Sequence, residues 1–548
     1  MMNTISENKR QQNTDLFFSV LVAAVLLCYL ICFGIINFRG FEIFCTADMY
    51  EDTLVARLMW EQKTLFPKNY LFGNQLYVLA TPVLAALFYG ITGSMNTGMV
   101  LATTLMSLLV LLSMDWMLKA FVRQRVLRLA ALLMFTAVTF GPQAVTREDG
   151  QLFFVMCSFY ACYLISYCFV LGDYVRCFSD ERARTPSLMI ALVLSFGMGI
   201  QSLRHTCVCV LPVLCFEVLR ILFGRISGNA LTDMLKRRSC LRAVCCFLAN
   251  AAGLFTAKLI NVTQNSIYEG VSIFNGASIS GKFRDLHNAL STVTGFEYIR
   301  GESGWFFTLM FILFIGTVIA SLVIWMTELR KKPDELRCLW LISLISILAV
   351  ILSSFVTSVK LRPIYLFIYY ILPSLSLIIV CGKLGPRMRN VLLTVICCFC
   401  ALNIYFSYSN QIETSCRGRE SNVYAELADY AVEHGFEYIY GAHSTTAPSI
   451  AVHSDGALIA GCWEDDCIFK LSRYTNIRDI YHLDDCTKGL YVFLEDELPL
   501  AKKETSAAGI PISFEKQFGP FYVYTASRQL MYPLSDNIDY AALFPDYN

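Results

Sequence analysis

Long apolar segments dominate this sequence and restrict what it can fold into. Runs of predominantly apolar residues recur from Leu16 to about Tyr408, in a chain of 548 residues of which 56% are hydrophobic and 16% charged. A helix needs roughly 20 such residues to cross a hydrocarbon core about 30 Å thick. From Gln411 to Asn548 the sequence becomes polar, as is typical of a water-soluble domain. The sequence therefore predicts an α-helical polytopic membrane protein with a small soluble domain at its end.

Clusters of basic residues predict the topology, because short loops rich in Lys and Arg stay in the cytoplasm. These clusters are Lys9 and Arg10; Lys119, Arg123, Arg125 and Arg128; Arg176, Arg182 and Arg184; Lys236, Arg237, Arg238 and Arg242; Arg330, Lys331, Lys332 and Arg337; and Lys383, Arg387 and Arg389. With all of them inside, we expect about 11 crossings, at 16–36, 98–118, 129–146, 151–171, 187–203, 206–224, 243–260, 304–327, 338–358, 363–381 and 391–408. An odd number of crossings places the C-terminal domain outside.

The domain organisation follows from these crossings. We expect a cytoplasmic tail over 1–15, a transmembrane domain over 16–408 and an extracytoplasmic α/β domain over 409–548. Two long outer loops, 37–97 and 261–303, interrupt the transmembrane domain. The protein is expected in the cell membrane. Its net charge of +1 gives no sign of a nucleic-acid partner.

The first outer loop contains two segments that we interpret as interfacial helices. Leu76 to Thr92 is apolar, but counting it as a span would move the cluster of Lys119 to Arg128 outside. Pro82 lies within it, and aromatic residues near its ends suit the headgroup level. An ordinary twelfth span is the alternative. Residues 51–62 place apolar side chains at helical spacing, and the charged Glu51, Asp52, Arg57 and Glu61 are expected on the other, solvated faces.

Two acidic clusters lie at the predicted outer ends of spans. The first, 47–52, contains Asp48, and the second, 146–150, contains Glu148 and Asp149. An ionisable side chain at membrane depth is costly to keep, so it usually faces a water-filled cavity, a partner or a substrate. Two such clusters on one side of the membrane indicate a shared site.

The residues of the first loop resemble a known family. The run Asp48-Met-Tyr-Glu-Asp-Thr-Leu-Val-Ala56-Arg57-Leu58-Met59, then Pro67, Leu76-Tyr77 and Phe88-Tyr89-Gly90-Ile-Thr-Gly93-Ser94, resembles the first outer loop of the GT-C glycosyltransferases. Gly141-Pro142-Gln-Ala-Val-Thr-Arg147-Glu148-Asp149 is similar to the end of a later span in that family. These integral membrane enzymes, which include protein O-mannosyltransferases and aminoarabinose transferases, take sugars from polyprenyl-phosphate donors. The resemblance covers residues 16–171, and the remaining spans resemble the family only in architecture.

The resemblance implies a general base that removes the proton of the acceptor hydroxyl. Asp48 matches the position of that base, and a partly desolvated carboxylate near a second acid is suited to the task. The alternative is that Asp48 caps the helix at 51–62. Glu51 and Asp52 are secondary acidic candidates for the acceptor. Asp149 and Glu148 would orient the acceptor, tune the base or hold a divalent cation such as Mg²⁺ or Mn²⁺, and the metal requirement stays open.

The leaving polyprenyl phosphate would need fixed cations. Lys360-Leu-Arg362-Pro-Ile-Tyr365 is similar to an Arg-Tyr element that opens a late span in the family, so Arg362 is the first candidate. Arg204 is the second, followed by Arg147 and Lys360, with Lys282 and Arg284 further candidates in the second outer loop. Each could instead extend to lipid headgroups. We expect His205 to be a hydrogen-bonded structural residue.

The second outer loop and the soluble domain carry weaker signals. The loop at 261–303 is interpreted as a lid, because unstructured loops of that length are usually functional. In the soluble domain we expect a helix from Ser421 to Glu433 and strands at 436–440, 457–459, 489–494 and 521–525. Cys416, Cys462, Cys467 and Cys486 would allow two disulfides there.

The sequence thus predicts a membrane hexosyl- or pentosyltransferase that uses a polyprenyl-phosphate-linked sugar donor and an extracytoplasmic glycan, lipid or protein acceptor. A transporter or flippase for a lipid-linked or polar solute is the main alternative, although transporters usually place their charges near mid-membrane. A sensor or assembly protein whose outer domain binds a ligand is a further one.

Overall fold

The computed structural model describes residues 2–72, 75–139, 160–179, 185–226, 237–260, 279–296, 299, 304–327, 335–420, 422–443, 445–464, 467–471, 480 and 488–531. The chain divides into two compact units. The first, here called the helical unit, comprises Met1–Gly34, Thr104–Ile260 and Val271–Ile412. The second, the sheet unit, comprises Ile35–Thr103, Asn261–Gly270 and Glu413–Asn548. The sheet unit therefore joins the first predicted outer loop to the C-terminal domain.

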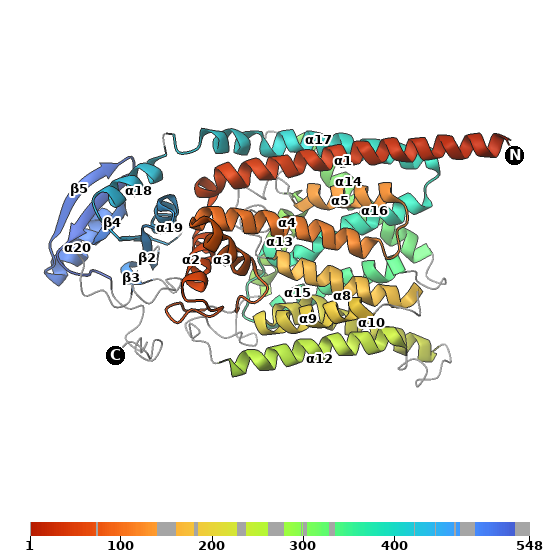
Figure 1. Ribbon diagram of the computed structural model, residues 1–548, viewed down its shortest axis with the longest axis horizontal. Coiled ribbons are helices and arrows are strands. Elements are labelled where there is room, and N and C mark those ends of the chain that lie inside the picture. The colour runs from red at the N-terminus through yellow and green to blue at the C-terminus, as the bar shows by residue number, and fades with distance from the viewer. Residues whose placement is uncertain are drawn as a thin grey trace. The chain divides into compact units, whose positions relative to one another are not determined.

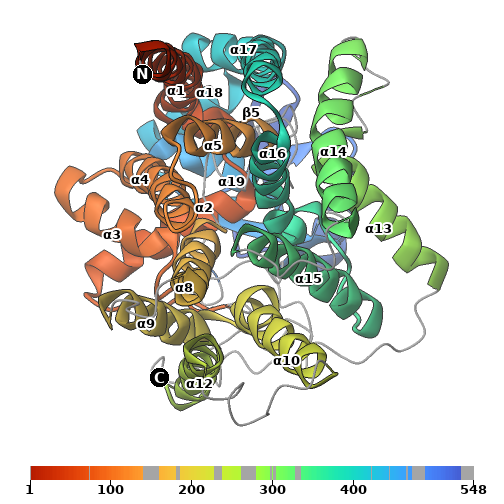
Figure 2. The same ribbon diagram turned by 90° about the vertical axis from the view of Figure 1, so that its right-hand side faces the viewer.

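The helical unit is built from long apolar helices, several of which are seen nearly end-on in Figure 2. They are α5 (Arg125–Thr139), α8 (Ala161–Ser179), α9 (Thr185–Gln201), α10 (Leu211–Ile226) with the π-helical turn η1 (Thr206–Val210), α12 (Arg238–Leu259), α13 (Ile279–Thr294), α14 (Gly304–Thr327), α15 (Glu335–Val356), the 3₁₀ helix η3 (Pro363–Tyr370) and α16 (Ile371–Lys383). Three more helices contribute residues to both units: α1 (Met2–Phe44), α4 (Met95–Leu118) and α17 (Pro386–Arg417).

Eight helices among the described residues are long and apolar enough to cross a membrane, which confirms a multi-pass membrane protein. They are Asn13–Phe44, Met95–Leu118, Thr206–Phe223, Arg238–Leu259, Gly304–Thr327, Leu336–Val356, Pro363–Lys383 and Pro386–Arg417. The other three expected spans, at 129–146, 151–171 and 187–203, overlap α5, α8 and α9, which are not among these eight. The total of eleven crossings remains a prediction.

Close packing of α9 and α12 fixes the turn that carries Arg204. Gly199 and Gly253 lie at the contact, and a Cβ on Gly253 would come within 2.1 Å of the Phe196 carbonyl oxygen. The Asn250 side chain then joins both neighbours, since its Nδ2 donates to the Ser195 carbonyl (3.0 Å) and its Oδ1 accepts from Thr206 Oγ1 (2.6 Å). The chain between α9 and η1 is thereby held at both ends.

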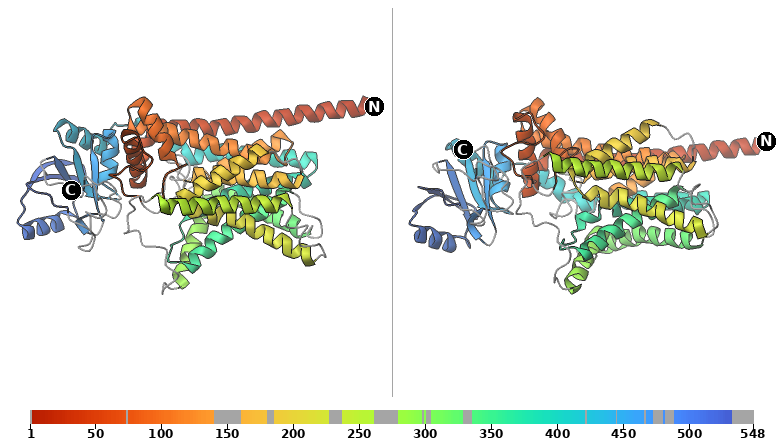
Figure 3. Two further views of the ribbon diagram at one scale, coloured as in Figure 1. Left: turned by 60° about the horizontal axis from the view of Figure 1, so that its bottom comes forward. Right: turned by 90° about the horizontal axis from the view of Figure 1, so that it is seen from below.

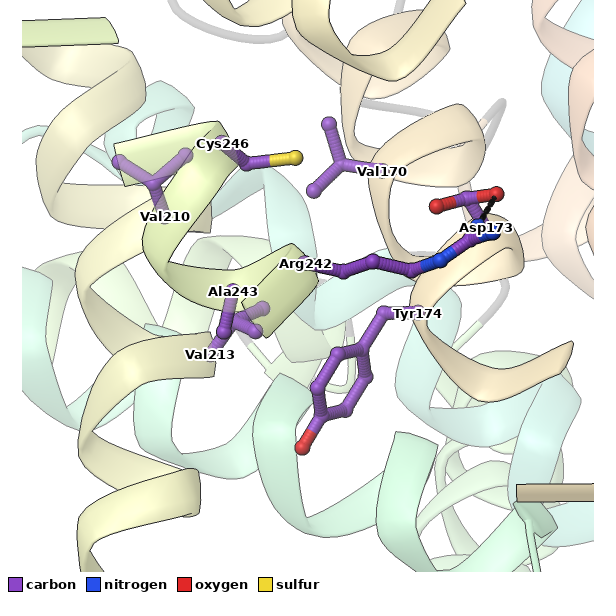
Figure 4. Close-up of a pocket in the computed structure, with 8 residues that line it drawn as sticks. All are labelled: Val170, Asp173, Tyr174, Val210, Val213, Arg242, Ala243 and Cys246. Atoms are coloured by element: carbon purple, nitrogen blue, oxygen red, sulfur yellow. Dashed lines mark hydrogen bonds and ion pairs between the residues drawn. The ribbon is translucent and has the colours of Figure 1, made fainter. Parts of the chain in front are cut away.

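A buried ion pair links α8 to α12 (Figure 4). Asp173, 1% exposed, pairs with Arg242 and accepts a hydrogen bond from Ser187 Oγ (2.5 Å). The hydroxyl of the next residue, Tyr174, donates to Glu217 Oε1 of α10 (2.6 Å). Arg242 belongs to a basic cluster that marks a predicted cytoplasmic loop, yet its guanidinium is buried in the bundle.

We expect Asp173→Asn to destabilise the helical unit by about 3–5 kcal/mol, because it leaves Arg242 buried without its carboxylate. The thermal unfolding midpoint of the protein in detergent measures the loss. The double variant Asp173→Asn, Arg242→Met is expected to lose less stability than Asp173→Asn alone. A double variant as unstable as the two single changes added together would contradict this.

The sheet unit contains two short helices before its sheet, α2 (Ala47–Glu61) and α3 (Thr81–Thr92), which pack against each other. The Trp60 ring lies on Gly90, where a Cβ would come within 2.2 Å of the indole. At about 1.5 Å per residue, α3 is too short to cross a bilayer. Its length agrees with the interfacial interpretation of Leu76 to Thr92.

The rest of the sheet unit is an α/β domain around a six-stranded mixed sheet, visible as blue arrows in Figure 3. Its strands, in the spatial order β3-β2-β1-β4-β6-β5, are β1 (Tyr438–Ala442), β2 (Ile459–Glu464), β3 (Cys467–Leu471), β4 (Gly489–Leu494), β5 (Ile512–Phe518) and β6 (Phe521–Ala526). The central β1 pairs in parallel with β2 and β4, and the remaining pairs are antiparallel. The helices are α18 (Val423–Glu433), α19 (Ala447–Ala451), η4 (Val452–Ser454) and α20 (Leu498–Ala508), labelled in Figure 1 except for η4.

The α/β prediction for the C-terminal domain is confirmed, with shifted boundaries. The first strand begins at Tyr438 rather than 436, and the strand expected at 457–459 begins only at Ile459. The elements β3, β5, α19 and α20 were not predicted from the sequence. Cys416 and Cys462 are free thiols, so the four cysteines of the C-terminal region do not form two disulfides.

Candidate functional site

Asp48 lies in the first turn of α2. The helix begins one turn earlier than the sequence suggested, because Thr46 is its N-cap and its hydroxyl accepts from the Met49 backbone N–H (3.4 Å). The alternative role for Asp48, as the cap of a helix at 51–62, is therefore wrong. The Asp48 side chain is half-buried, and a carboxylate in a first helical turn also interacts favourably with the helix dipole.

Glu51 and Asp52, expected on a solvated face, are buried at 7% and 1% exposure. The expectation was wrong because α2 packs against α3 and against α19 of the C-terminal domain, so it has little solvated surface at these positions. Asp52 accepts a hydrogen bond from the Tyr77 hydroxyl. Its Oδ2 has no hydrogen-bond partner among the described residues. Burial, and then the charge of Asp48, raise the pKa of Asp52 well above its ordinary value.

This raised pKa predicts that Asp52→Asn becomes stabilising as the pH rises. The unfolded chain releases the Asp52 proton near an ordinary pKa of about 3.9, while the folded protein keeps it until a higher pH. Between those pH values the wild type loses up to about 1.4 kcal/mol of stability per pH unit, and the asparagine variant does not. Thermal unfolding midpoints at pH 5 and pH 8 measure the difference. A variant destabilised equally at both pH values would contradict the prediction.

Arg204 forms the centre of a cationic and aromatic cluster in the helical unit. Its guanidinium carbon lies 4.8 Å from the ring centre of Tyr160, 5.6 Å from that of Tyr163 and 5.4 Å from that of Tyr365. No carboxylate among the described residues pairs with it. Tyrosine rings stabilise a cation at their faces without neutralising its charge. The cluster can therefore offer positive charge to an anion.

Arg362 is brought to the same cluster. It is the N-cap residue of η3, immediately before Pro363, and its charge acts on the Tyr160 hydroxyl more weakly than that of Arg204 does. Lys360, two residues earlier, is exposed. The structure thus brings the first two predicted phosphate ligands together around Tyr160.

Lys282 on α13, considered as a further cation for the phosphate, instead binds backbone carbonyl oxygens. The ammonium group is buried and donates to the carbonyl oxygens of Thr357 (3.0 Å) and Val359 (2.9 Å). Phe283 next to it packs edge-on against Phe355 of α15 (5.2 Å between ring centres). These contacts attach part of the predicted lid segment to the chain just before Arg362. They leave Lys282 engaged with backbone oxygens.

His205 is structural, as expected. It is fully buried, its Nε2 lies 3.4 Å from Ser166 Oγ, and burial lowers its pKa to about 3. The imidazole is therefore neutral at physiological pH and supplies no positive charge to the cluster.

The second acidic segment, with Arg147, Glu148 and Asp149, lies outside the described residues. Within the described ranges, no three His, Cys, Asp or Glu side chains gather in a way that could hold a metal ion. The roles expected for Arg147, Glu148 and Asp149 remain predictions.

The tyrosines around Arg204 were not predicted from the sequence. Tyr160 immediately precedes α8 and Tyr163 lies in its first turn, and their spacing of three residues places both on one side of the helix. The Tyr163 hydroxyl also bonds to Ser202 Oγ (2.7 Å), two residues before Arg204. Aromatic residues at a predicted span end were the available signal, but such residues usually mark the membrane interface.

Comparisons with known proteins identify the fold. No family model matches the sequence, and no curated protein matches it. Among solved structures, ArnT from Cupriavidus metallidurans bound to undecaprenyl phosphate matches with a TM-score of 0.54 and 14% identity, covering 94% of this chain and 98% of that one. The apo state of the same protein gives a TM-score of 0.52 and 11% identity, with the same coverage. The archaeal oligosaccharyltransferase AglB from Archaeoglobus fulgidus, in complex with an inhibitory peptide and a dolichol-phosphate, gives 0.42 and 10% identity, covering 80% of this chain and 64% of that chain.

Proposed function

We propose that this chain, which has the GT-C fold, is a membrane glycosyltransferase that transfers a sugar from a polyprenyl-phosphate donor to an extracytoplasmic acceptor. The observation that carries the proposal is the cluster around Arg204. A guanidinium held between three tyrosine rings, beside a second arginine and without a carboxylate partner among the described residues, is suited to binding a phosphate. The fold shared with a structure that holds undecaprenyl phosphate supports a lipid phosphate as the ligand.

In the proposed reaction, the acceptor hydroxyl oxygen attacks the anomeric carbon of the donor sugar. The bond from that carbon to the phosphate oxygen breaks, and the polyprenyl phosphate leaves with the electron pair. Asp48 takes the proton of the acceptor hydroxyl. A half-buried carboxylate is appropriate for this step, since it is accessible to a substrate and incompletely hydrated.

The leaving phosphate gains negative charge as the bond breaks, and fixed cations stabilise it best when they need no rearrangement. Arg204 meets this requirement through its tyrosine contacts, and Arg362 through its fixed place at the start of η3. We assign both to the phosphate. Lys360 and Arg147 are secondary cations, and Asp149 and Glu148 are assigned to the acceptor side.

Asp52 keeps its proton in this scheme. Its burial and raised pKa favour the neutral acid at Asp52, beside the proposed base Asp48. Glu51, buried one residue before it, is assigned to the same acidic group. We propose that the C-terminal domain is extracytoplasmic, as the basic clusters of the sequence predict.

Binding and turnover by the purified protein test the proposal. In nanodiscs, undecaprenyl phosphate should raise the thermal unfolding midpoint by mass action, and undecaprenol, which lacks the phosphate, should not. A panel of polyprenyl-phosphate hexoses and pentoses should then yield free polyprenyl phosphate and a glycosylated acceptor. Equal stabilisation by both lipids, or no turnover of any donor with envelope extracts as acceptor, would overturn the proposal. Donor movement across the bilayer without cleavage would indicate a flippase instead.

A further inference from the structure

One segment of the C-terminal domain is hydrogen-bonded to residues of the first predicted outer loop, 37–97, in the same unit. Residues 452–460, here called the clamp segment, connect α19 to β2 and include η4. The segment turns sharply at Asp455 (φ +50°) and Gly456 (φ +93°), both in the left-handed region. Such a turn is accessible to Asp and Gly at low cost, and it presents backbone groups to whatever packs beside it.

Helix α2 supplies two side chains to the clamp segment. The hydroxyl of Tyr50, 1% exposed, accepts from the Ala460 backbone N–H (3.0 Å) and donates to the Leu458 carbonyl (3.4 Å). Two turns along the helix, Arg57 Nη1 donates to the Gly456 carbonyl (2.7 Å). Residues seven apart lie on one face of a helix, so a whole face of α2 is bonded to the segment.

The Tyr50 hydroxyl completes an otherwise open strand edge. Among the described residues, β3 pairs with β2 only at Trp463 and Glu464, whereas β1 pairs with β2 from Ile459 onward. The edge of β2 near Ala460 that faces away from β1 therefore needs a partner from elsewhere. Tyr50 supplies it, which is why a buried tyrosine is accommodated there.

Two further contacts hold the clamp segment to the beginning of α4. The carboxylate of Asp455 accepts from the Asn96 backbone N–H (2.8 Å), in the first turn of α4, where a negative charge is favourable. The Asn96 side-chain amide donates to the Val452 carbonyl (2.8 Å).

The end of α1 holds His453, which is 3% exposed. Asn422 Oδ1 accepts from the Tyr424 N–H (3.0 Å), so its Nδ2 faces His453 Nε2 (3.3 Å), which must accept. The hydrogen of the ring is then on Nδ1, which donates to Glu42 (3.1 Å). The clamp segment is thereby fixed by α1, α2 and α4.

We propose that the C-terminal domain positions the catalytic base, because its clamp segment holds the helix that carries Asp48. Tyr50 is the positioning residue. It lies two residues from Asp48, about 3 Å along the helix axis. Its hydroxyl makes two hydrogen bonds to the backbone of the clamp segment. Proton transfer requires oxygen atoms within about 2.6–3.2 Å, so a small shift of α2 removes Asp48 from reach. This inference rests on the proposed function.

Tyr50→Phe tests the proposal, with Tyr491→Phe as the matched control. Tyr491 is also fully buried in the sheet unit, and its hydroxyl also accepts a backbone N–H, that of Leu530 (3.1 Å), while donating to Gln529 (2.5 Å). The two changes remove the same atom from similar surroundings, but only Tyr50 belongs to α2. We expect Tyr50→Phe to lower kcat about tenfold with KM for donor and acceptor changed less than twofold. Tyr491→Phe should change kcat less than twofold.

Hydrogen exchange gives a readout that does not depend on activity. Peptides covering Ala460 should exchange faster in Tyr50→Phe than in the wild type, and those covering Leu530 should not. Gly456→Ala is a second disruption, since its Cβ would meet Met95 Sδ at 2.3 Å in addition to the strained φ. It should lower kcat as Tyr50→Phe does, at unchanged KM.

The outcomes separate this inference from the proposed function. An inactive wild type overturns the transferase proposal and the positioning role with it. An active wild type with faster exchange at Ala460 and normal kcat in Tyr50→Phe overturns the positioning role alone. Equal losses of kcat in Tyr50→Phe and Tyr491→Phe would also overturn it, because both would then reflect general destabilisation.

Discussion

Replacing Asp48 with asparagine is expected to lower kcat for sugar transfer by about 10²–10⁴-fold, the usual contribution of a positioned general base. Asparagine has nearly the same shape but cannot accept the proton of the acceptor hydroxyl. The KM for the donor should change little, because the donor phosphate is assigned to Arg204 and Arg362. Steady-state kinetics with purified wild type and variant in nanodiscs measure both parameters.

Asp496→Asn is the control for this prediction, since it makes the same chemical change at an exposed acid in the sheet unit. It should leave kcat within twofold of the wild type. Asp52→Asn provides a second comparison on α2 itself, at an acid whose pKa is raised by burial. Full activity of Asp48→Asn at normal folded yield would contradict the assignment of Asp48 as the base. A large rise in donor KM would instead place Asp48 in donor binding.

Local patterns explain why much of the fold could be predicted. Apolar runs such as that of α14, and the helical spacing of Leu54, Val55, Leu58 and Met59 in α2, are properties of a few consecutive turns. The soluble domain was recognised in the same way, from short strands such as β4 and β6. Each of these signals lies within the element that it predicts.

The burial of α2 could not be predicted in this way. Glu51 and Asp52 look like solvated residues because they are charged and lie on other helix faces than the apolar residues at helical spacing. They are buried because Tyr50 is bonded to Leu458 across 408 positions and because α19 packs on the same helix. A contact between such distant segments leaves no periodic pattern in either of them. The free Cys462 is a comparable case, since its place inside β2 decides that its thiol is a buried core group.

The cluster around Arg204 combines charges that stand out in the sequence with aromatic residues that do not. Arg204 and Arg362 are rare charges at the ends of apolar runs, which makes them visible in a sequence. Tyr160, Tyr163 and Tyr365 are common residues at such places, so only the structure shows that they surround one guanidinium. The tyrosines decide how Arg204 is held, and this leads to a second prediction of large effect.

Arg204→Met is expected to lower kcat by about 10²–10³-fold, the effect of removing one fixed group that stabilises developing negative charge. Methionine fills a similar volume and can lie against the tyrosine rings, so folding should be retained. The affinity for undecaprenyl phosphate should fall in parallel. The thermal shift that the lipid causes measures this affinity. Arg387→Met, at an exposed arginine of α17, should leave both kcat and binding unchanged.

Arg204→Lys separates charge from geometry. Lysine keeps the positive charge but lacks the planar, forked guanidinium that stacks on tyrosine rings and binds phosphate through two hydrogen bonds. We therefore expect Arg204→Lys to fall between the wild type and Arg204→Met in kcat. Activity of Arg204→Lys equal to the wild type would mean that charge alone suffices and that the tyrosine cluster serves only packing. Normal activity of Arg204→Met would contradict the assignment of Arg204 to the phosphate. Arg362 would then have to bind the phosphate without Arg204.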